Sequence, residues 1–359
     1  ILGSAQDGAS TISECFQAAS RMRVGDADSW HAEWSRQAVS KARRAEEVRS
    51  GAVHTAKASL LRASNYHRVS ELFLAPFDPR RRRIFASCVA ASEAHLRLLT
   101  PPGESVAIGL SDGSGDVLDA YFIRPRGTAP HPVVIAFGGL DGCKDELVQR
   151  MARAATERGL ALLLVDLPGQ GKALRERNMP GRTDTEVPVA ACVDYLLQRD
   201  DIDGNAIALY GASLGGVYAA RAASAEHRLK AVVSDGVIFN LHAGLQSRLT
   251  HGEVEGWALL QWVFGCDTPT AVVEKSKQLA MAEFMDRIRC PYLIVQGEYD
   301  FLGLQTAIDA FDHAKRCGVN AELRVFTGEE TGASHCQADN PTLGMEFICD
   351  WLALRLVAR

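Results

Sequence analysis

A strand–turn–helix pattern around one serine constrains this chain more than any other stretch. The apolar run 207–210 leads into the small residues of the Gly-Ala-Ser-Leu-Gly-Gly sequence at 211–216, and a helical pattern follows. A nucleophile elbow needs small residues on both sides of its serine, because the strained backbone packs closely against neighbouring segments. A G-x-S-x-G sequence also arises by chance, so the hypothesis that Ser213 is a nucleophile depends on finding its partners.

Two candidate partners follow Ser213 in the chain. Asp300 comes just after the buried-strand run 292–297, and His335 lies on a loop after the strand-like run 321–326. Taken singly, such an Asp is more often a turn residue or a helix N-cap, and a loop histidine is usually solvated. The order Ser…Asp…His, with each residue just past a strand, is that of an α/β-hydrolase. We therefore expect Ser213, Asp300 and His335 to form a catalytic triad, with Asp235 as the alternative acid.

These residue types suit acyl transfer. A serine hydroxyl is a poor nucleophile at neutral pH, so a base must take its proton as it attacks. Histidine titrates near neutrality and can accept that proton and return it to a leaving group. A carboxylate fixes the imidazole tautomer and stabilises the imidazolium that forms.

A glycine-rich loop is the candidate oxyanion hole. The buried-strand run 133–137 ends in Gly-Gly-Leu-Asp-Gly at 138–142. In an α/β-hydrolase one donor is the amide after the nucleophile, here Leu214, and the other lies on the loop after the third strand. We expect the second donor to be Leu140, with Gly139 as the alternative. The simpler interpretation of the loop is an ordinary glycine turn.

The chain divides near residue 103. Before it, amphipathic patterns predict helices over about 30–49, 56–73 and 83–99, and we interpret the arginine run 80–83 as a solvated loop between helices. After it, eight strand candidates alternate with helices, at 104–110, 117–124, 133–137, 160–165, 206–210, 229–234, 292–296 and 322–326. This predicts an α/β-hydrolase fold, a doubly wound, mainly parallel eight-stranded sheet over 104–359, preceded by a helical domain over 1–103.

One connection is long enough to hold structure of its own. Residues of about 238–288 carry helical patterns with several aromatic side chains. An insertion of this length is usually a cap or lid, and together with the N-terminal helices it would roof the site. Aromatic side chains in such a segment more often serve packing than substrate binding. A roofed, largely apolar pocket still favours an apolar or aromatic substrate.

Composition narrows the class of protein further. A net charge of −5 gives no general attraction to nucleic acid or to an anionic membrane, and no apolar run reaches the length of a membrane span. The first residues also lack the features of a signal peptide. Nine cysteines without a C-x-x-C motif favour free thiols, so we expect a cytoplasmic protein. Cys143 and Cys336 lie beside the proposed site, where we interpret them as small filler residues; neither has the spacing of a metal ligand.

Several motifs together resemble one group of α/β-hydrolases. They are the N-terminal helices, the Gly-Gly-Leu-Asp-Gly-Cys-Lys-Asp-Glu loop at 138–146, Asp-Leu-Pro-Gly-Gln-Gly at 166–171, and the elbow. The group includes 2,6-dihydropseudooxynicotine hydrolase and fungal pigment-pathway hydrolases that shorten a polyketide chain. The resemblance runs from about residue 45 to the end and places the group's triad on Ser213, Asp300 and His335. It implies hydrolysis of a carbon–carbon bond next to a ketone, no cofactor, and often a homodimer, in which residues 1–103 would serve as cap and dimerisation domain.

The expected function is therefore that of a serine hydrolase acting through an acyl-enzyme on an aromatic or polyketide-like ketone. An esterase, thioesterase or acyl-transferring cyclase with the same triad is the alternative. A binding protein without catalysis is the third hypothesis, against which the complete triad argues. The segment 235–240, Asp-Gly-Val-Ile-Phe-Asn, departs from the aromatic-glycine-glycine pattern of the nicotine enzyme, and the substrate itself stays open.

Overall fold

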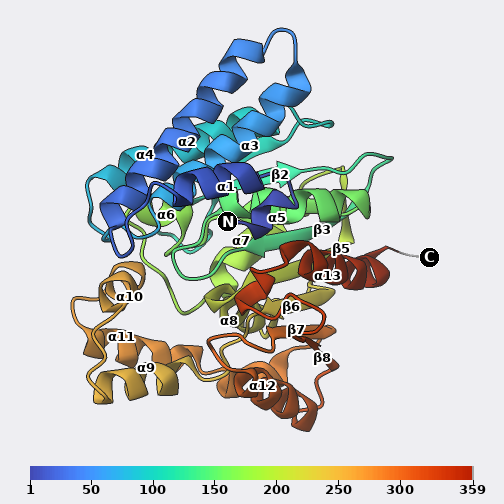
Figure 1. The fold of residues 1–359 in the computed structure, drawn as a ribbon. Helices are drawn as coiled ribbons and strands as arrows, with labels where there is room; N and C mark the ends of the chain where they lie inside the picture. Colours follow the sequence, from blue (N-terminus) through green and yellow to red (C-terminus); the bar gives the residue numbers. More distant parts are fainter. Residues whose placement is uncertain (358–359) are drawn as a thin grey trace.

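The computed structural model describes residues 1–357, and eight strands form a single sheet at its centre (Figure 1). The strand order is β1-β2-β4-β3-β5-β6-β7-β8. Strand β2 runs antiparallel to β1 and to β4, and all other neighbours are parallel. The strands span Glu104–Gly109, Val117–Ile123, His131–Phe137, Ala161–Val165, Ile202–Ala212, Ala231–Asp235, Tyr292–Gly297 and Ala321–Phe326, numbered β1 to β8. The predicted α/β-hydrolase fold is confirmed.

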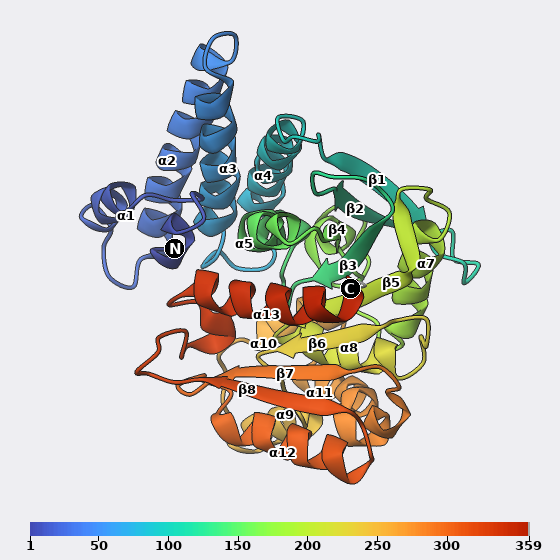
Figure 2. The ribbon, with the colours of Figure 1, turned by 90° about the vertical axis from the view of Figure 1, so that its right-hand side faces the viewer.

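Helices cover both faces of the sheet, which explains why its central strands are largely apolar. Every residue of β4, β6 and β7 is buried. One face packs against α5 (Lys144–Glu157) and α13 (Pro341–Leu356), and the other against α6 (Gly171–Arg175), α7 (Glu186–Leu196), α8 (Leu214–Ala223) and α12 (Leu304–Arg316). Figure 2 shows α13 beside β6, with its axis running roughly along β6 and β7. Parallel strands buried on both faces read as continuous hydrophobic runs, which is why the sequence predicted them well.

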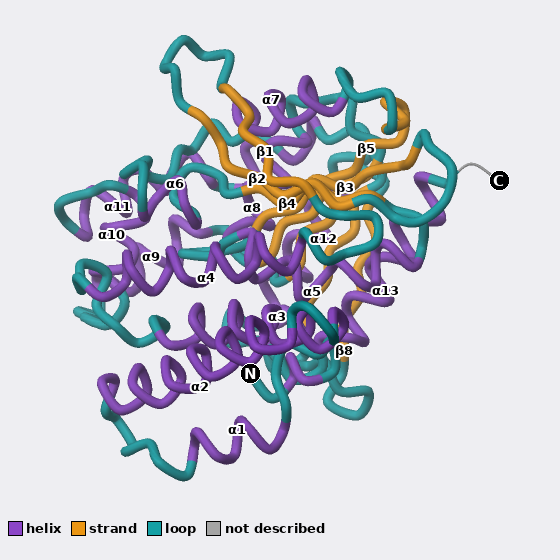
Figure 3. Tube along the Cα trace, turned by 90° about the horizontal axis from the view of Figure 1, so that it is seen from above, coloured by secondary structure: helices purple, strands orange, loops and turns teal. Residues whose placement is uncertain are grey.

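Four α-helices precede the sheet: α1 (Ile12–Ala19), α2 (Ala27–Val48), α3 (Val53–Ser70) and α4 (Arg80–Leu96). The Thr11 and Asp26 side chains cap α1 and α2 by accepting hydrogen bonds from backbone amides. The Trp34 and Tyr66 rings, 5.1 Å apart, join α2 to α3. Figure 3 shows α3 and α4 between the sheet and the outer helices α1 and α2. Helix α1 was not predicted from the sequence.

The interpretation of the arginine run as a solvated loop was wrong. Arg80 begins α4, and Arg81 is buried, with its guanidinium donating to the carbonyl oxygen of Leu74. Arg82 and Arg83 are exposed, so only half of the run faces solvent. A run of arginines does not reveal which side chain will find buried hydrogen-bond acceptors on other segments of the chain. Those acceptors determine which arginine is buried and which is solvated.

The connection between β6 and β7 holds three α-helices, α9 (Leu241–Thr250), α10 (Trp257–Phe264) and α11 (Pro269–Ser276), followed by three short 3₁₀-helices within 277–287. In Figure 1 they lie below the N-terminal helices, with α10 nearest to them. The rings of Phe77 and Trp262 are in edge contact, 6.4 Å apart, so the two helical segments touch. Within residues 1–357, no helix combines the length and the apolarity that crossing a bilayer demands.

Candidate active site

Ser213 lies at a sharp turn between β5 and α8. Its backbone has φ 56° and ψ −123°, a conformation that is strained for a residue with a side chain. Small neighbours make the turn possible, because a Cβ at Gly211 would overlap the Gly215 carbonyl and one at Gly215 would overlap the Gly138 carbonyl. The Ser213 amide donates to the carbonyl oxygen of Asp235 at 2.6 Å, which ties the turn to the neighbouring strand.

His335 and Asp300 form a hydrogen-bonded pair beside this turn. The His335 Nδ1 atom lies 2.9 Å and 2.8 Å from the two carboxylate oxygens of Asp300, whose side chain is fully buried. The Phe301 ring packs on the imidazole with the ring centroids 4.5 Å apart. In the described structure His335 makes no hydrogen bond with the Ser213 hydroxyl; its Nε2 lies 3.6 Å from Cys336 Sγ. The hydrogen bond between a catalytic histidine and its serine is often long until substrate binds.

Asp235, the alternative acid, is engaged elsewhere. Its Oδ2 atom accepts hydrogen bonds from the Tyr210 hydroxyl and from Arg150 Nη2, both at 2.8 Å. Arg150 Nη2 also donates to the Cys336 carbonyl oxygen at 2.5 Å. Asp235 therefore serves, through Arg150, to hold the loop that carries His335. Sequence reasoning missed Arg150, since nothing in its helix marks it as the partner of a strand-end aspartate and a distant loop.

The glycine-rich loop lies directly against the nucleophile. A Cβ built on Gly139 would come within 2.7 Å of Ser213 Cβ and 3.3 Å of its Oγ. The Gln170 side chain holds the loop by donating to the carbonyl oxygens of Gly138 at 2.5 Å and Gly139 at 3.1 Å. Within residues 1–357, the amides of Gly139, Leu140 and Leu214 donate no hydrogen bond. All three amides are thus free to bind a substrate oxygen, and Leu140 and Gly139 stay alternatives for one donor.

Replacing Gly139 by alanine is expected to lower kcat/KM by about 10²–10³-fold, the usual cost of losing one oxyanion donor. The new methyl group would push the loop away from Ser213 because it meets Ser213 Cβ at 2.7 Å. Rates with p-nitrophenyl butyrate measure the effect. Gly109→Ala is the matched control, because a Cβ there meets nothing within 4 Å. Full activity in Gly139→Ala would show that this loop does not serve as an oxyanion loop.

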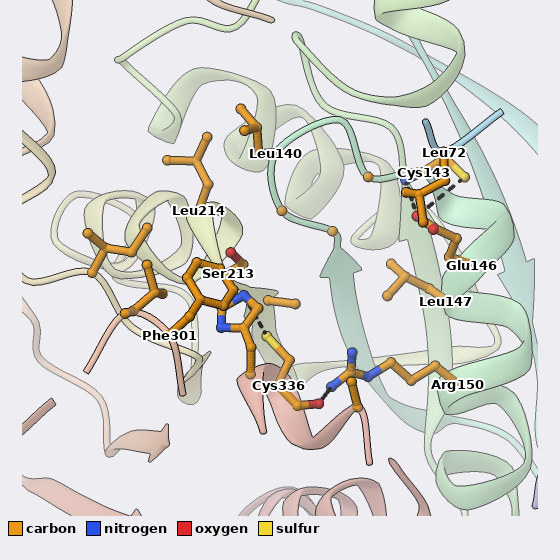
Figure 4. A pocket seen from close by; sticks show the side chains of 18 of the residues that line it. Leu72, Leu140, Cys143, Glu146, Leu147, Arg150, Ser213, Leu214, Phe301 and Cys336 are labelled. Carbon is orange, nitrogen blue, oxygen red and sulfur yellow. Dashed lines mark hydrogen bonds between the residues drawn. The ribbon is translucent and has the colours of Figure 1, made fainter. Parts of the chain in front are cut away.

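A cavity of about 1180 Å³ connects these groups. Ser213 and His335 both line it, and Figure 4 shows Leu140, Leu214 and Phe301 around Ser213, with Glu146, Leu147 and Arg150 along α5. The apolar lining comes mainly from the glycine-rich loop, α8, the loop after β6, α9, α10 and the loop after β7: Leu140, Leu214, Ile238, Leu241, Leu245, Leu260, Phe264, Phe301 and Leu302. The polar lining comes from the N-terminal segment, α3, α5, α9 with its N-cap, and α12: Ser4, Asp7, Asn65, Arg68, Glu146, Gln149, Arg150, Asn240, Ser247, Arg248 and Thr306. The cavity therefore combines an apolar wall at the serine with polar groups on several of the helices that surround it.

The two cysteines beside the site are buried and unpaired by disulfides. Burial raises the pKa of the Cys143 and Cys336 thiols well above the usual range, which disfavours a thiolate nucleophile at neutral pH. No cluster of three or more His, Cys, Asp or Glu side chains that could hold a metal ion occurs within the part of the chain described.

The fold and this arrangement define an α/β-hydrolase. The profile of the family described as "Esterase FrsA-like" matches residues 9–250, and that of the "Prolyl oligopeptidase family" matches residues 148–355. The chain belongs to the FrsA-like esterase family of α/β-hydrolases.

Individual relatives agree with the resemblance seen in the sequence. The chain is 30% identical to 20-hydroxy-prefusarin hydrolase FUS2 of Gibberella moniliformis, over 84% of this chain and 81% of that protein. It is also 30% identical to hydrolyase poxO of Penicillium oxalicum, over 82% and 80%. The solved structure of 2,6-dihydroxy-pseudo-oxynicotine hydrolase superposes with a TM-score of 0.83 at 27% identity, over 99% of this chain and 96% of that one. The predicted relationship is confirmed.

Proposed function

We propose that this chain is a serine hydrolase that cleaves a carbon–carbon bond next to a ketone in an aromatic or polyketide-like substrate. The observation that carries the proposal is the strained Ser213 in the same cavity as a histidine paired with a buried carboxylate. The names of the relatives support the substrate class, since they include a hydrolase of 20-hydroxy-prefusarin and one of an oxynicotine derivative.

The mechanism follows from the roles of these groups. Ser213 Oγ bonds to the ketone carbon while its proton passes to His335 Nε2, and the carbonyl electrons move onto the oxygen. The amides of Leu214 and of Leu140 or Gly139 stabilise this oxyanion. Asp300 holds the imidazole by its Nδ1 and stabilises the imidazolium. No metal or cofactor takes part in this proposal.

Collapse of the tetrahedral intermediate re-forms the carbonyl and breaks the carbon–carbon bond. The electron pair leaves with the carbon fragment, which takes the proton from His335. This step requires a fragment that stabilises the negative charge, such as the enolate of a 1,3-diketone or an electron-rich ring carbon. Water then attacks the acyl-serine with His335 as its base, and the second collapse releases a carboxylic acid and restores Ser213.

The helices around the cavity complete the proposal. Segments α1–α4 and α9–α11 serve as a cap that limits access of water and supplies the apolar wall, which suits a substrate much larger than a simple ester. We also propose that the protein is a homodimer, which the exposed apolar side chains of Ile12 and Phe16 on α1 support. The free cysteines support a cytoplasmic location.

A matched substrate panel tests the reaction. Aryl esters, 1,3-diketones and acyl-phenols of similar size would be incubated with the wild-type protein and with Ser213→Ala, and the products identified by mass spectrometry. We expect serine-dependent cleavage of the ketones at rates comparable to those of the esters. Cleavage of esters alone would contradict the carbon–carbon hydrolase and favour the second candidate, an esterase, thioesterase or acyl-transferring cyclase, for which the FrsA-like esterase family is the specific support.

A further inference from the structure

A buried cluster of five charged side chains lies behind the glycine-rich loop. Its members, which we call the arginine–carboxylate cluster, are Arg68, Glu71, Arg81, Asp141 and Arg175. Each of these side chains is 8% exposed or less. They come from α3, from the turn after it, from α4, from the glycine-rich loop and from α6. The cluster therefore joins the N-terminal helices to a loop of the catalytic sheet.

Asp141 is the residue on which the cluster converges. Arg68 Nη2 donates to its backbone carbonyl oxygen at 3.0 Å, and Arg81 Nη2 donates to Oδ2 at 2.8 Å. Arg175 pairs with Oδ1. Glu71 Oε1 in turn accepts from Arg68 and from Arg175, both at 2.9 Å. Three guanidinium groups thus hold both the main chain and the side chain of Asp141.

Asp141 lies where a change in its main chain would move the loop beside Ser213. Asp141 directly follows Leu140, and its φ of 58° lies in the left-handed region, where a residue with a side chain persists only if its surroundings hold it. Two residues earlier, Gly139 packs against Ser213. A rotation of the main chain at Asp141 would consequently move the free amides of Leu140 and Gly139 relative to the nucleophile.

Stability alone does not explain the cluster. Buried ion pairs can often be replaced by apolar side chains without loss of stability, because removing charges from water is costly. Here several buried polar atoms also lack a hydrogen-bond partner within residues 1–357, among them Glu71 Oε2, Arg81 Nε and Arg175 Nη1. Burial by itself would raise the pKa of the Asp141 carboxyl, yet Arg175, Arg68 and Arg81 outweigh this and hold it below its usual range. Asp141 is therefore ionised in the folded protein.

The cluster also contacts the helices between β6 and β7. The Trp262 ring of α10 lies with its centroid 5.0 Å from Arg81 Cζ and 5.5 Å from Arg175 Cζ. Cation–π contacts of this kind favour one arrangement of the ring and the guanidinium. Arg81 and Arg175, two of the three arginines that hold Asp141, thus contact both helical segments that surround the cavity.

We infer that Asp141 and Arg81 are positioning residues for the oxyanion hole, and that the N-terminal helices are needed for the chemical step as well as for covering the cavity. The inference rests on the proposed function, because it assigns the loop amides to the oxyanion. The network acts through the main chain of the loop and does not itself touch the substrate.

Kinetics of cluster variants test this inference. Arg81→Met keeps the length of the side chain and removes its charge and donors. With p-nitrophenyl butyrate we expect kcat to fall about 10- to 100-fold with KM changed less than about threefold, since a misplaced donor costs no more than the 10²–10³-fold of a lost one. Arg81→Lys should recover part of kcat. The affinity of an aryl trifluoromethyl ketone, which forms a tetrahedral adduct on serine, should fall by the same factor as kcat/KM.

Arg199→Met is the matched control. Arg199 pairs with Glu104 and Asp201 and lies 3.8 Å from the Phe122 ring centroid, but it does not line the cavity. We expect Arg199→Met to lose thermal stability and to keep the wild-type kcat.

A wild-type kcat in folded Arg81→Met would overturn the inference. If Arg81→Met does not fold, a wild-type kcat in Asp141→Asn would overturn it. Fluorophosphonate labelling of wild-type Ser213 separates the two proposals, because its absence overturns the proposed function itself.

Discussion

Replacing Ser213 by alanine is expected to lower kcat about 10⁶-fold on every substrate that the enzyme cleaves, whether ketone or ester. The proposed mechanism has no second route to the acyl-enzyme once the hydroxyl is lost. Alanine preserves the Cβ and the strained backbone of φ 56°, so the elbow and the cavity should keep their shape. Steady-state rates measure the loss. The affinity for a reaction product, measured by calorimetry, should change little.

Cys336 provides the control for this prediction. Its Sγ lies 3.6 Å from His335 Nε2, which makes it the other nucleophilic atom near the base. Because burial raises the pKa of this thiol, we expect Cys336→Ala to keep kcat within about tenfold of the wild-type value. A large loss in Cys336→Ala, together with an active Ser213→Ala protein, would assign the covalent step to the cysteine and contradict the proposed mechanism.

Asp300→Asn is expected to lower kcat about 10⁴-fold with little change in the fold. Both carboxylate oxygens of Asp300 face His335 Nδ1, at 2.9 Å and 2.8 Å. The amide of an asparagine can donate its NH₂ group to Nδ1, which would favour the tautomer with the proton on Nε2. A protonated Nε2 cannot accept the proton of Ser213. The measurement is kcat across pH 5–9, together with the melting temperature.

Asp235→Asn gives the opposite expected pattern. Asp235 is fully buried and pairs with Arg150 and Tyr210, so removing its charge leaves Arg150 without its carboxylate. Breaking a fully buried pair typically costs about 3–5 kcal/mol of unfolding free energy, and the 22% exposure of the Arg150 side chain places the expected loss at or below the lower end of this range. We expect this loss in a denaturant titration and a kcat within about tenfold of wild type. If Asp235→Asn instead lost kcat by about 10⁴ and Asp300→Asn did not, Asp235 would be the triad acid.

Much of the sheet could be predicted because its signals are local. The strands predicted at 117–124 and 292–296 differ by one residue from the observed Val117–Ile123 and Tyr292–Gly297. Strands buried on both faces are largely apolar, and turns rich in glycine and proline bound them. The carboxyl ends of parallel strands share one edge of the sheet, which is why the chain order of Ser213, Asp300 and His335 already indicated a common site.

The contacts that support the site could not be predicted in the same way. The interpretation of the arginine run was wrong because Arg81 reaches Asp141, whose partners Arg68 and Arg175 are far away in the sequence. Arg150, which holds the His335 loop, belongs to a helix with an ordinary amphipathic pattern. No local signal distinguishes these arginines from solvated ones, since the acceptors that make their burial favourable come from other segments.

The sequence by itself determined the class of fold, the alternation of strands and helices, and the three residues of the expected triad, because periodicity, turn residues and chain order are properties of neighbouring residues. Only the tertiary structure decided that Asp300 and not Asp235 faces His335, that α10 meets the N-terminal helices, and that three buried arginines converge on Asp141. The physical reason is that hydrogen bonds and ion pairs act over a few ångströms. Which charged groups come that close depends on how whole helices and strands pack, which no stretch of sequence specifies alone.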